Sequence, residues 1–207
     1  MSVASGGPAL EEIALFPLRT VLFPGGPLEL RIFEPRYLDM IRTTLRNDRE
    51  FGVLLIRAGS EAGPADTVDV GTSARIVDFR QLPEGLLGIT CRGGRRFRLE
   101  SRRRQRDGLN LGRVSWLNEP ASLALAANFA SMAQLLESLL SGLDALYPEP
   151  ERKLDDADWV GRRFAEILPI APADKQYCLE LEDATQRLMF LEPFSAALRM
   201  RTRGRGA

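Results

Sequence analysis

The chain has 207 residues, of which 44% are hydrophobic and 27% charged, and its 28 basic side chains balance its 28 acidic ones. Such a chain can bury a core as one or two domains, and its zero net charge does not direct it to nucleic acid or to an acidic membrane. Histidine is absent, which excludes Ser-His-Asp and Cys-His catalysis and histidine-containing zinc sites.

The sequence shows no signal for secretion, membrane insertion or redox chemistry. Residues 1–15 lack a basic segment followed by a long apolar run, and no stretch of about 18 apolar residues occurs. Cys91 and Cys178 are far apart and form no metal-binding or redox spacing. We therefore expect a reduced, cytoplasmic protein that spans no membrane and needs no metal or cofactor.

The opening stretch, residues 15–37, contains two phrases in which apolar residues surround a proline. Pro17 and Pro24 each fix φ, remove an N–H and push the preceding residue toward extended backbone. The pattern predicts a strand, a turn and a second strand, followed by a helix that begins at Pro35. Helical spacing of three and four then continues at Leu38, Ile41 and Leu45.

The rest of the first half, to about residue 118, predicts further strands joined by glycine and proline turns. A turn at residues 82–85 makes a hairpin of its two neighbouring strands, and Gly93-Gly94 is expected to break the chain before the next strand. Short strands in this order indicate a small barrel or sandwich. The expected strands are residues 51–57, 71–81, 86–90, 95–103 and 109–117.

The second half predicts helices. Pro120 suits a first helical position, and apolar residues then recur for some two dozen residues, until Pro148. A loop is expected at residues 147–153. Three more helices should follow: one capped by Asp155 or Asp156 and ended by Pro169, one opened by Pro172, and one starting at an Asp183–Gln186 capping box that Pro193 kinks or ends.

Several phrases in these elements carry a family resemblance. Besides residues 15–37, they are the Gly-Thr pair at 71–72, the Gly-Arg-Arg-Phe phrase at 94–97, the Gln-Tyr-Cys-Leu-Glu phrase at 176–180 and the Arg-Leu pair at 187–188. In this order, over roughly residues 12–200, the chain resembles the amino-terminal substrate-binding domain of Lon-type ATP-dependent proteases. It resembles a stand-alone member, without the ATPase and protease domains.

The resemblance implies an α+β fold, with an N-terminal PUA-like β-barrel that holds one helical insertion and a C-terminal helical bundle. The expected division is a flexible N-terminus at 1–11, the barrel at 12–118, the bundle packed on it at 119–200 and a disordered tail at 201–207. The implied function is a non-catalytic, proteolysis-related module that captures exposed apolar or disordered polypeptide segments. A protease or chaperone is the partner machine that this function suggests.

The phrase Glu34-Pro35-Arg36-Tyr37 has both a structural and a functional interpretation. Structurally, Pro35 occupies the first helical turn, Glu34 favours the positive helix end and Tyr37 anchors the helix. Functionally, Arg36, Tyr37 and Asp39 form part of a rim that contacts polypeptide. Four apolar residues, Phe33, Phe79, Leu82 and Leu86, form either part of the core or an exposed apolar groove. The candidate polypeptide-binding residues are Phe33, Glu34, Arg36, Tyr37, Asp39, Phe79, Leu82 and Leu86.

The main alternative is RNA or nucleotide binding through an arginine-rich strand. Arginine contacts phosphate well, but few aromatic residues stand between these arginines to stack on bases, and a half-exposed strand explains the alternation about Phe97 and Leu99. The nine arginines are Arg92, Arg95, Arg96, Arg98, Arg102, Arg103, Arg104, Arg106 and Arg113.

Three further possibilities have simpler explanations. A hydrolase using a carboxylate or a Ser-Lys pair is the least favoured function, because the chain has only two lysines, Lys153 and Lys175, and neither lies in a recognisable catalytic motif. Cys91 could be a reactive thiol, but without a histidine to activate it a buried structural role is favoured. A cluster of acidic residues around the predicted loop at 147–153 could bind a divalent cation, but it lacks the spacing of a calcium loop, so helix capping and solvation explain it better. Its members are Glu149, Glu151, Asp155, Asp156 and Asp158.

Overall fold

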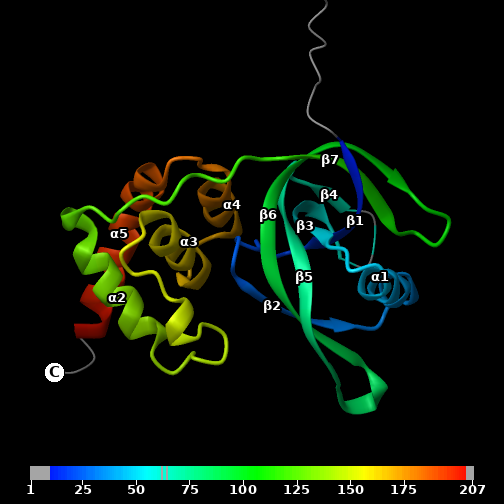
Figure 1. Cartoon of the computed structure of the whole chain (residues 1–207), viewed down its shortest axis with the longest axis horizontal. Coiled ribbons are helices and arrows are strands. Elements are labelled where there is room, and N and C mark those ends of the chain that lie inside the picture. The colour runs from blue at the N-terminus through cyan, green and yellow to red at the C-terminus, as the bar shows by residue number, and fades with distance from the viewer. Residues whose placement is uncertain (1–9, 62, 64, 204–207) are drawn as a thin grey trace, which may run out of the picture. The chain divides into compact units, whose positions relative to one another are not determined.

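In the computed structural model, which describes residues 10–61, 63 and 65–203, strands occupy the first half of the chain and helices the second (Figure 1). The chain divides into two compact units, Met1–Asn118 and Glu119–Ala207. This arrangement confirms the predicted mixed α+β class. Of the flexible N-terminus predicted at 1–11, residues 1–9 lie outside the described residues and Glu11 begins a strand. Of the disordered tail predicted at 201–207, residues 204–207 lie outside them, and the last helix extends to Arg203.

The described residues of the first unit form seven strands and one α-helix. The helix is α1 (Pro35–Arg46), and a 3-10 turn, η1 (Pro83–Gly85), connects two of the strands. The strands are β1 (Glu11–Leu18), β2 (Pro27–Ile32), β3 (Phe51–Gly59), β4 (Ala65–Thr67), β5 (Val70–Gln81), β6 (Leu87–Arg104) and β7 (Asn110–Trp116).

The strand pairings form a circuit through β1. β1 pairs antiparallel with β7 and parallel with β3. β7 pairs with β6, β6 with β5 and β5 with β3, all antiparallel, so that the pairings lead back to β1. Two strands stand outside this circuit: β2 pairs with β6 and β4 pairs with β3.

The sheet separates two apolar clusters of the first unit. Successive side chains of a strand point to opposite faces, so neighbouring residues of β1 belong to different clusters. Phe16 belongs to the larger cluster and Leu15 to the smaller one. Each fully buried apolar side chain contributes about 1.5–3 kcal/mol. The larger cluster, which includes α1, contains buried Phe16, Leu18, Leu22, Ile32, Tyr37, Met40, Ile41, Phe51, Val53, Ala74, Ile89, Cys91 and Leu109.

The predicted break at Gly93-Gly94 is wrong, because β6 runs without interruption through both glycines. A Cβ at Gly93 would lie 2.1 Å from the Phe23 carbonyl oxygen, and one at Gly94 would lie 2.4 Å from the Ser73 hydroxyl. Glycine is therefore needed here for close approach rather than for a turn. The Gly93 amide and carbonyl both bond to the Gly25-Gly26 loop, at 2.8 Å.

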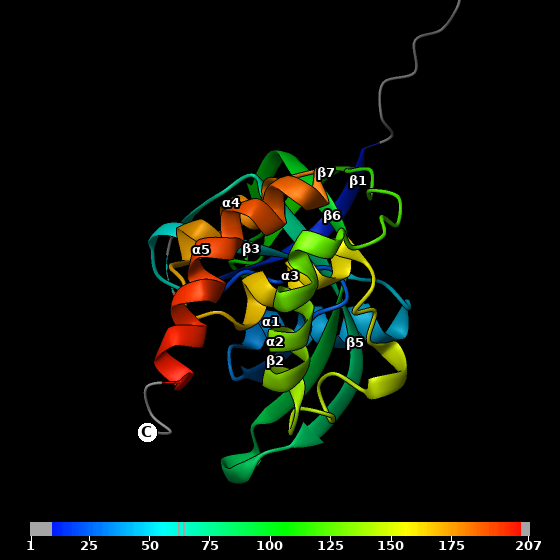
Figure 2. The same cartoon turned by 90° about the vertical axis from the view of Figure 1, so that its left-hand side faces the viewer.

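Over residues 119–203, the second unit contains four α-helices and two 3-10 turns, and its helices face the viewer in Figure 2. Helix α3 contacts α2, α4 and α5. Among the described residues, no helix combines the length and hydrophobicity needed to cross a bilayer. The elements are η2 (Ala127–Phe129), α2 (Ala130–Leu140), η3 (Glu149–Glu151), α3 (Ala157–Ile167), α4 (Pro172–Glu180) and α5 (Ala184–Arg203).

The long helix predicted from Pro120 is also wrong, because α2 begins only at Ala130. The preceding backbone bonds to the segment that leads into α3: Leu125 N–H donates to Asp155 O and Ala157 N–H donates to Leu123 O, both at 2.7 Å. These bonds hold the chain extended, so the helical spacing of its apolar residues is overridden by tertiary structure.

The predicted caps of the later helices are largely correct. Asp156 caps α3, since its carboxylate accepts a hydrogen bond from Trp159 N–H at 2.7 Å. Asp183 accepts bonds from Thr185 N–H and Gln186 N–H of α5, but the Gln186 side chain donates to the Asp183 carboxylate instead of accepting a bond from the Asp183 backbone N–H, so the capping box is incomplete. Pro193 lies inside α5 and does not end it.

Candidate functional site

The connection between β2 and α1 carries the predicted Glu34-Pro35-Arg36-Tyr37 phrase. Glu34 has extended backbone at the N-cap position and Pro35 follows at the start of the helix, as the structural interpretation predicts. Phe33, just before them, exposes 64% of its surface, whereas Arg36 exposes only 8% and Tyr37 only 4%. This short segment therefore turns one aromatic ring outward and another inward.

Arg36 ties α1 to two neighbouring loops. Its guanidinium donates to Gly108 O at 3.1 Å and to Glu61 O at 3.3 Å, and it pairs with the Glu34 carboxylate at 2.7 Å. Hydrogen bonds from a charged donor are stronger than neutral ones, so these contacts fix the start of the helix. The burial of Arg36 leaves it positioned to support a binding surface rather than to form its outer rim.

Tyr37 anchors α1 in the core. Its ring stacks on Phe16 with centroids 3.9 Å apart, and burial raises the pKa of its hydroxyl. Asp39, two residues after Tyr37, is exposed and pairs with Arg42 at 2.9 Å on the solvent side of the helix. Of the predicted rim residues, Asp39 is thus the one that solvent reaches freely.

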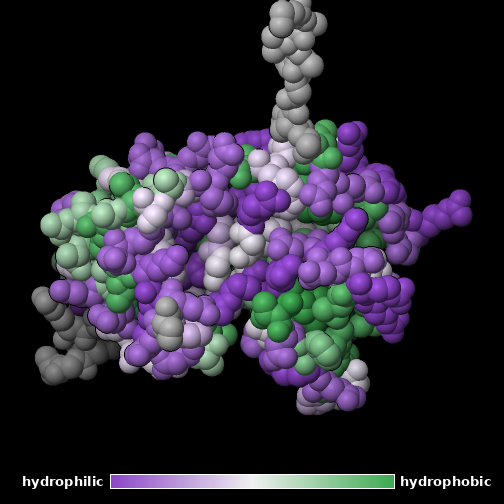
Figure 3. Space-filling model, in the orientation of Figure 1, coloured by the Kyte–Doolittle hydropathy of each residue, from purple (hydrophilic) through white to green (hydrophobic). Residues whose placement is uncertain are grey.

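The predicted groove residues lie just after β2 (Phe33), on β5 (Phe79) and in the connection between β5 and β6 (Leu82 and Leu86). Phe79 exposes 64% of its surface, and Leu82 and Leu86 are half-buried at the hairpin end. Leu30 of β2, Ile89 of β6 and Phe79 of β5 stand in one cross-strand row, so their side chains share a face. In Figure 3, hydrophobic side chains gather over β2 and beside the β5–β6 hairpin.

A cavity of about 390 Å³ opens on the same strand. Its walls come from β1, β2, the start of α1 and the loop after β3, and they include three of the predicted residues: Phe33, Glu34 and Tyr37. We call the exposed Phe33 and Phe79 and the half-buried Leu30, together with this cavity, the β2 apolar surface. The remaining lining residues are Phe16, Leu18, Glu29, Leu30, Arg31, Ile32 and Glu61.

Four apolar residues of that cavity were not predicted from the sequence: Phe16, Leu18, Leu30 and Ile32. A usable signal is present in β2, where Leu-Glu-Leu-Arg-Ile alternates apolar and charged residues as a strand with one apolar face should. No such signal was available for Phe16 and Leu18 of β1, because β1 reaches this cavity through its pairing with β3 and β7, which are distant in sequence.

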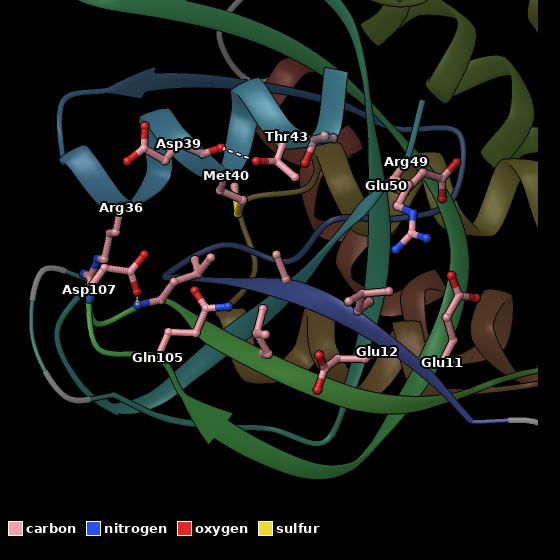
Figure 4. Close-up of a pocket in the computed structure, with 15 residues that line it drawn as sticks. Glu11, Glu12, Arg36, Asp39, Met40, Thr43, Arg49, Glu50, Gln105 and Asp107 are labelled. Carbon is pink, nitrogen blue, oxygen red and sulfur yellow. Dashed lines mark hydrogen bonds between the residues drawn. The ribbon is translucent and has the colours of Figure 1, made fainter. Parts of the chain in front are cut away.

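A second cavity, of about 280 Å³, lies between α1 and the strands β1 and β7 (Figure 4). Most of its lining residues are polar or charged, and they include the carboxylates of Glu11, Glu12, Asp39, Glu50 and Asp107. Arg103, which bonds both oxygens of Glu12, holds the pKa of that carboxyl below its usual value. Within the described part of the chain, no group of three or more histidine, cysteine or acidic residues is arranged to hold a metal ion.

The arginines of β6 are largely engaged by the sheet itself. Arg96 is buried and donates to Asn118 O at 3.0 Å, and Arg95 lies over the Trp116 ring at 4.2 Å from its centroid. Arg103 forms a two-bond pair with Glu12, at 2.7 and 2.8 Å. These contacts use the guanidinium groups that a phosphate backbone would need, so the geometry does not favour nucleic-acid binding.

The residues considered for catalysis have structural partners. Lys175 Nζ donates to Glu166 O at 2.6 Å, and the Ser195 hydroxyl donates to Glu192 O at 2.8 Å. Burial raises the pKa of the Cys91 thiol to about 12, which makes it a poor nucleophile at neutral pH. In the acidic cluster, Asp158 pairs with Arg162 and Arg187.

Comparison with known proteins gives consistent matches. The crystal structure of a Lon N-terminal domain protein from Xanthomonas campestris is 36% identical, superposes with a TM-score of 0.74, and the match covers 88% of this chain and 98% of that one. Lon protease 2 of Myxococcus xanthus is 27% identical over 86% of this chain and 22% of the relative. Protein cereblon of Danio rerio is 34% identical over 54% of this chain and 25% of the relative.

The chain thus spans about a quarter of the length of these two curated relatives. Residues 12–192 match the family described as the ATP-dependent protease La (LON) substrate-binding domain, and the part matched in the Lon proteases is of similar extent. The chain therefore belongs to the Lon substrate-binding domain family.

Proposed function

We propose that this chain is a non-catalytic binding module that captures exposed apolar or disordered polypeptide segments on the β2 apolar surface. The observation that carries the proposal is the exposure of Phe33 and Phe79, each 64% exposed, beside a cavity of about 390 Å³. Large apolar side chains gathered on a surface mark interaction sites, and a cavity lets the surface take up a partner's side chain. Family membership supports a protein partner.

All eight predicted residues keep a role in this proposal. Phe33, Phe79, Leu82 and Leu86 would contact the polypeptide, and Asp39 would lie at the exposed margin. Glu34, Arg36 and Tyr37 would position the β2–α1 connection through the ion pair and ring stacking described above. A protease or chaperone would receive the captured segment.

We also propose that the first unit is a PUA-like barrel and the second a helical bundle. The circuit of strand pairings through β1 fits a small PUA-like barrel, and the contacts of α3 with α2, α4 and α5 fit a helical bundle. The two buried thiols, Cys91 and Cys178, suit the reducing conditions of a cytoplasmic protein.

The test is fluorescence anisotropy of a labelled, permanently unfolded polypeptide titrated with the protein, without ATP, at low and high salt. Wild type should bind at both salt concentrations and leave the label uncleaved, since apolar contacts are not screened. Replacing Phe33 and Phe79 together by Ser should weaken binding about tenfold or more, because aromatic anchors dominate interface energies.

Met189→Ser is the matched control, because Met189 is an apolar residue of the second unit with a similar exposure of 60%. It should bind like wild type. Equal loss in both variants would show non-specific adhesion instead of a site. A labelled single-stranded RNA run alongside covers the other outcome: binding of RNA alone, abolished by salt, would reject the proposal.

A further inference from the structure

Strand β2 has a free edge. Within the described residues, its only partner strand is β6, so its second edge is unpaired there. An unpaired edge presents main-chain N–H and C=O groups that another extended chain can bond. The question is which chain fits this edge.

The hydrogen-bonding pattern shows which residues point outward. Gly93 N–H donates to Gly26 O at 2.8 Å, and bonded pairs alternate along an antiparallel ladder. This alternation directs the main-chain groups of Leu28, Leu30 and Ile32 toward β6. It directs those of Glu29 and Arg31 to the free edge, together with Pro27, which has no N–H to leave unpaired.

The side chains alternate in the same way. Glu29 and Arg31 are exposed, whereas Leu28 and Leu30 are half-buried and Ile32 is buried. The strand thus has an apolar face and a face with one negative and one positive charge, placed symmetrically about Leu30. Within the described residues, Arg31 makes no ion pair or side-chain hydrogen bond, although Glu29 pairs with Arg80 at 3.1 Å.

This symmetry makes β2 complementary to itself. When two copies of the strand pair antiparallel with Leu30 opposite Leu30, Glu29 of each copy stands opposite Arg31 of the other. Both of these pairs are hydrogen-bonded positions of the new ladder, because Glu29 and Arg31 are the outward-directed residues. Cross-strand pairs of opposite charge stabilise such a ladder, and like charges in the same places would destabilise it.

We propose that the free edge of β2 is a self-association site at which two copies of this chain join their sheets across a twofold axis. The charge pattern selects the second copy, because each copy supplies the counter-charge that Arg31 of the other lacks. The pairing would place two β2 apolar surfaces along one continuous sheet. A six-residue strand buries less area than most stable dimer interfaces, so the dimer should be weak, with a Kd in the micromolar to millimolar range.

The test uses charge reversal and mixing, followed by sedimentation velocity over a range of concentrations. Arg31→Glu puts four acidic residues at the joint, and Glu29→Arg puts four basic ones there, so each variant alone should dimerise at least about 10-fold more weakly than wild type. Mixed in equal amounts, the two variants restore opposite charges at both pairs and should associate about as well as wild type. Circular dichroism of each variant checks that it is folded.

A second measurement needs no variant. Amide hydrogen exchange of wild type should show protection of Glu29 and Arg31 that rises with protein concentration, while Leu28 and Leu30 stay unchanged because β6 already binds them. A wild type that stays monomeric at millimolar concentration, a mixture that does not associate, or protection independent of concentration would overturn the proposal. Protection of the edge only when unfolded polypeptide is added would assign the edge to a client strand instead, and polypeptide binding itself is tested separately above.

Discussion

Two aromatic residues four positions apart have opposite environments in this protein. Phe33 exposes 64% of its surface, whereas Tyr37 is stacked on Phe16 and exposes 4%. The sequence places both in one short phrase, and nothing in residue type separates them. Their stability effects should differ accordingly.

Tyr37→Ala should lower the free energy of unfolding by about 3–5 kcal/mol, because it removes a packed ring and leaves a cavity against Phe16. Phe33→Ala should change it by no more than about 0.5 kcal/mol, as expected of an exposed position. Urea denaturation followed by circular dichroism measures both. A large loss in the Phe33 variant would mean that this ring is part of the core.

The buried thiol of Cys91 predicts a pH dependence. Burial raises its pKa from an ordinary 9.0 to about 12, so the folded state keeps the proton over a range in which the unfolded state loses it. The unfolded state is therefore favoured as pH rises: the contribution to stability is intact below pH 9.0 and declines between 9.0 and about 12. The slope is about 1.4 kcal/mol per pH unit for one such group.

Cys91→Ala should accordingly make the decline of the free energy of unfolding shallower above pH 9.0. Urea denaturation of variant and wild type at several pH values from neutral to moderately alkaline gives the two slopes. Tyrosines and lysines titrate in the same range in both proteins, so the difference between slopes is the quantity to compare. Identical slopes would show that the thiol titrates in the folded state as it does in the unfolded one.

At the scale of elements, the glycines of the β5–β6 hairpin have two different functions. Gly85, in η1, has φ of +76° with no atom within 4 Å of a Cβ, so it serves backbone conformation. Gly93, inside β6, serves the close approach of the Phe23 carbonyl. A sequence-based analysis treats both as turn signals, which is why the break predicted at Gly93 is wrong.

Alanine substitution should separate these functions. Gly85→Ala should cost about 1–2 kcal/mol for left-handed backbone. Gly93→Ala should cost about 3 kcal/mol or more, because a Cβ 2.1 Å from the Phe23 oxygen forces the backbone of the Gly25-Gly26 loop away. Thermal and urea denaturation compare them. The reverse ranking would mean that this loop yields easily.

Elements with local signals were predictable from the sequence, and elements set by distant contacts were not. The alternation in β2 and the proline at the start of α1 are local, and so is the capping aspartate of α3. The extended segment before α2 is not, because its backbone bonds depend on Asp155 and Ala157, some thirty residues away. Strand β4 was missed, since three residues carry too little pattern.

The candidate site likewise has residues that could be predicted from the sequence and features that depend on distant contacts. Phe33 and Phe79 could be named as groove candidates from residue type and position, but their exposure could not be read from periodicity. The buried state of Arg36 depends on Gly108, 72 residues away, and on Glu61. Such long-range partners decide whether a charged residue supports a surface or forms it.

At the scale of the whole molecule, each unit contains one of the two tryptophans, Trp116 in the first and Trp159 in the second. We predict that the units pack together and unfold as one, since only residues 117–122 separate the end of β7 from Leu123, whose carbonyl accepts a hydrogen bond from Ala157 N–H, and Pro120 stiffens this link. Trp116→Phe and Trp159→Phe leave a single reporter in either unit.

Fluorescence melts of the two variants, with circular dichroism as a common reference, should then give midpoints that agree once each variant's own change in stability is subtracted. Coincident transitions are the mark of cooperative unfolding. Separate midpoints for the two reporters would show that the units are energetically independent, and the stiff link would then have no stabilising effect.

The position of β1 in the strand circuit has a consequence for how this protein is made. β1 leaves the ribosome before the other strands of its sheet, yet its antiparallel partner β7 ends at Trp116, about a hundred residues later. Contacts so far apart in sequence are slow to form, because a long loop must close first. Until β7 is synthesised, β1 has an unpaired edge that other chains can bond, so a chaperone that shields nascent strands should raise the yield of correctly folded protein.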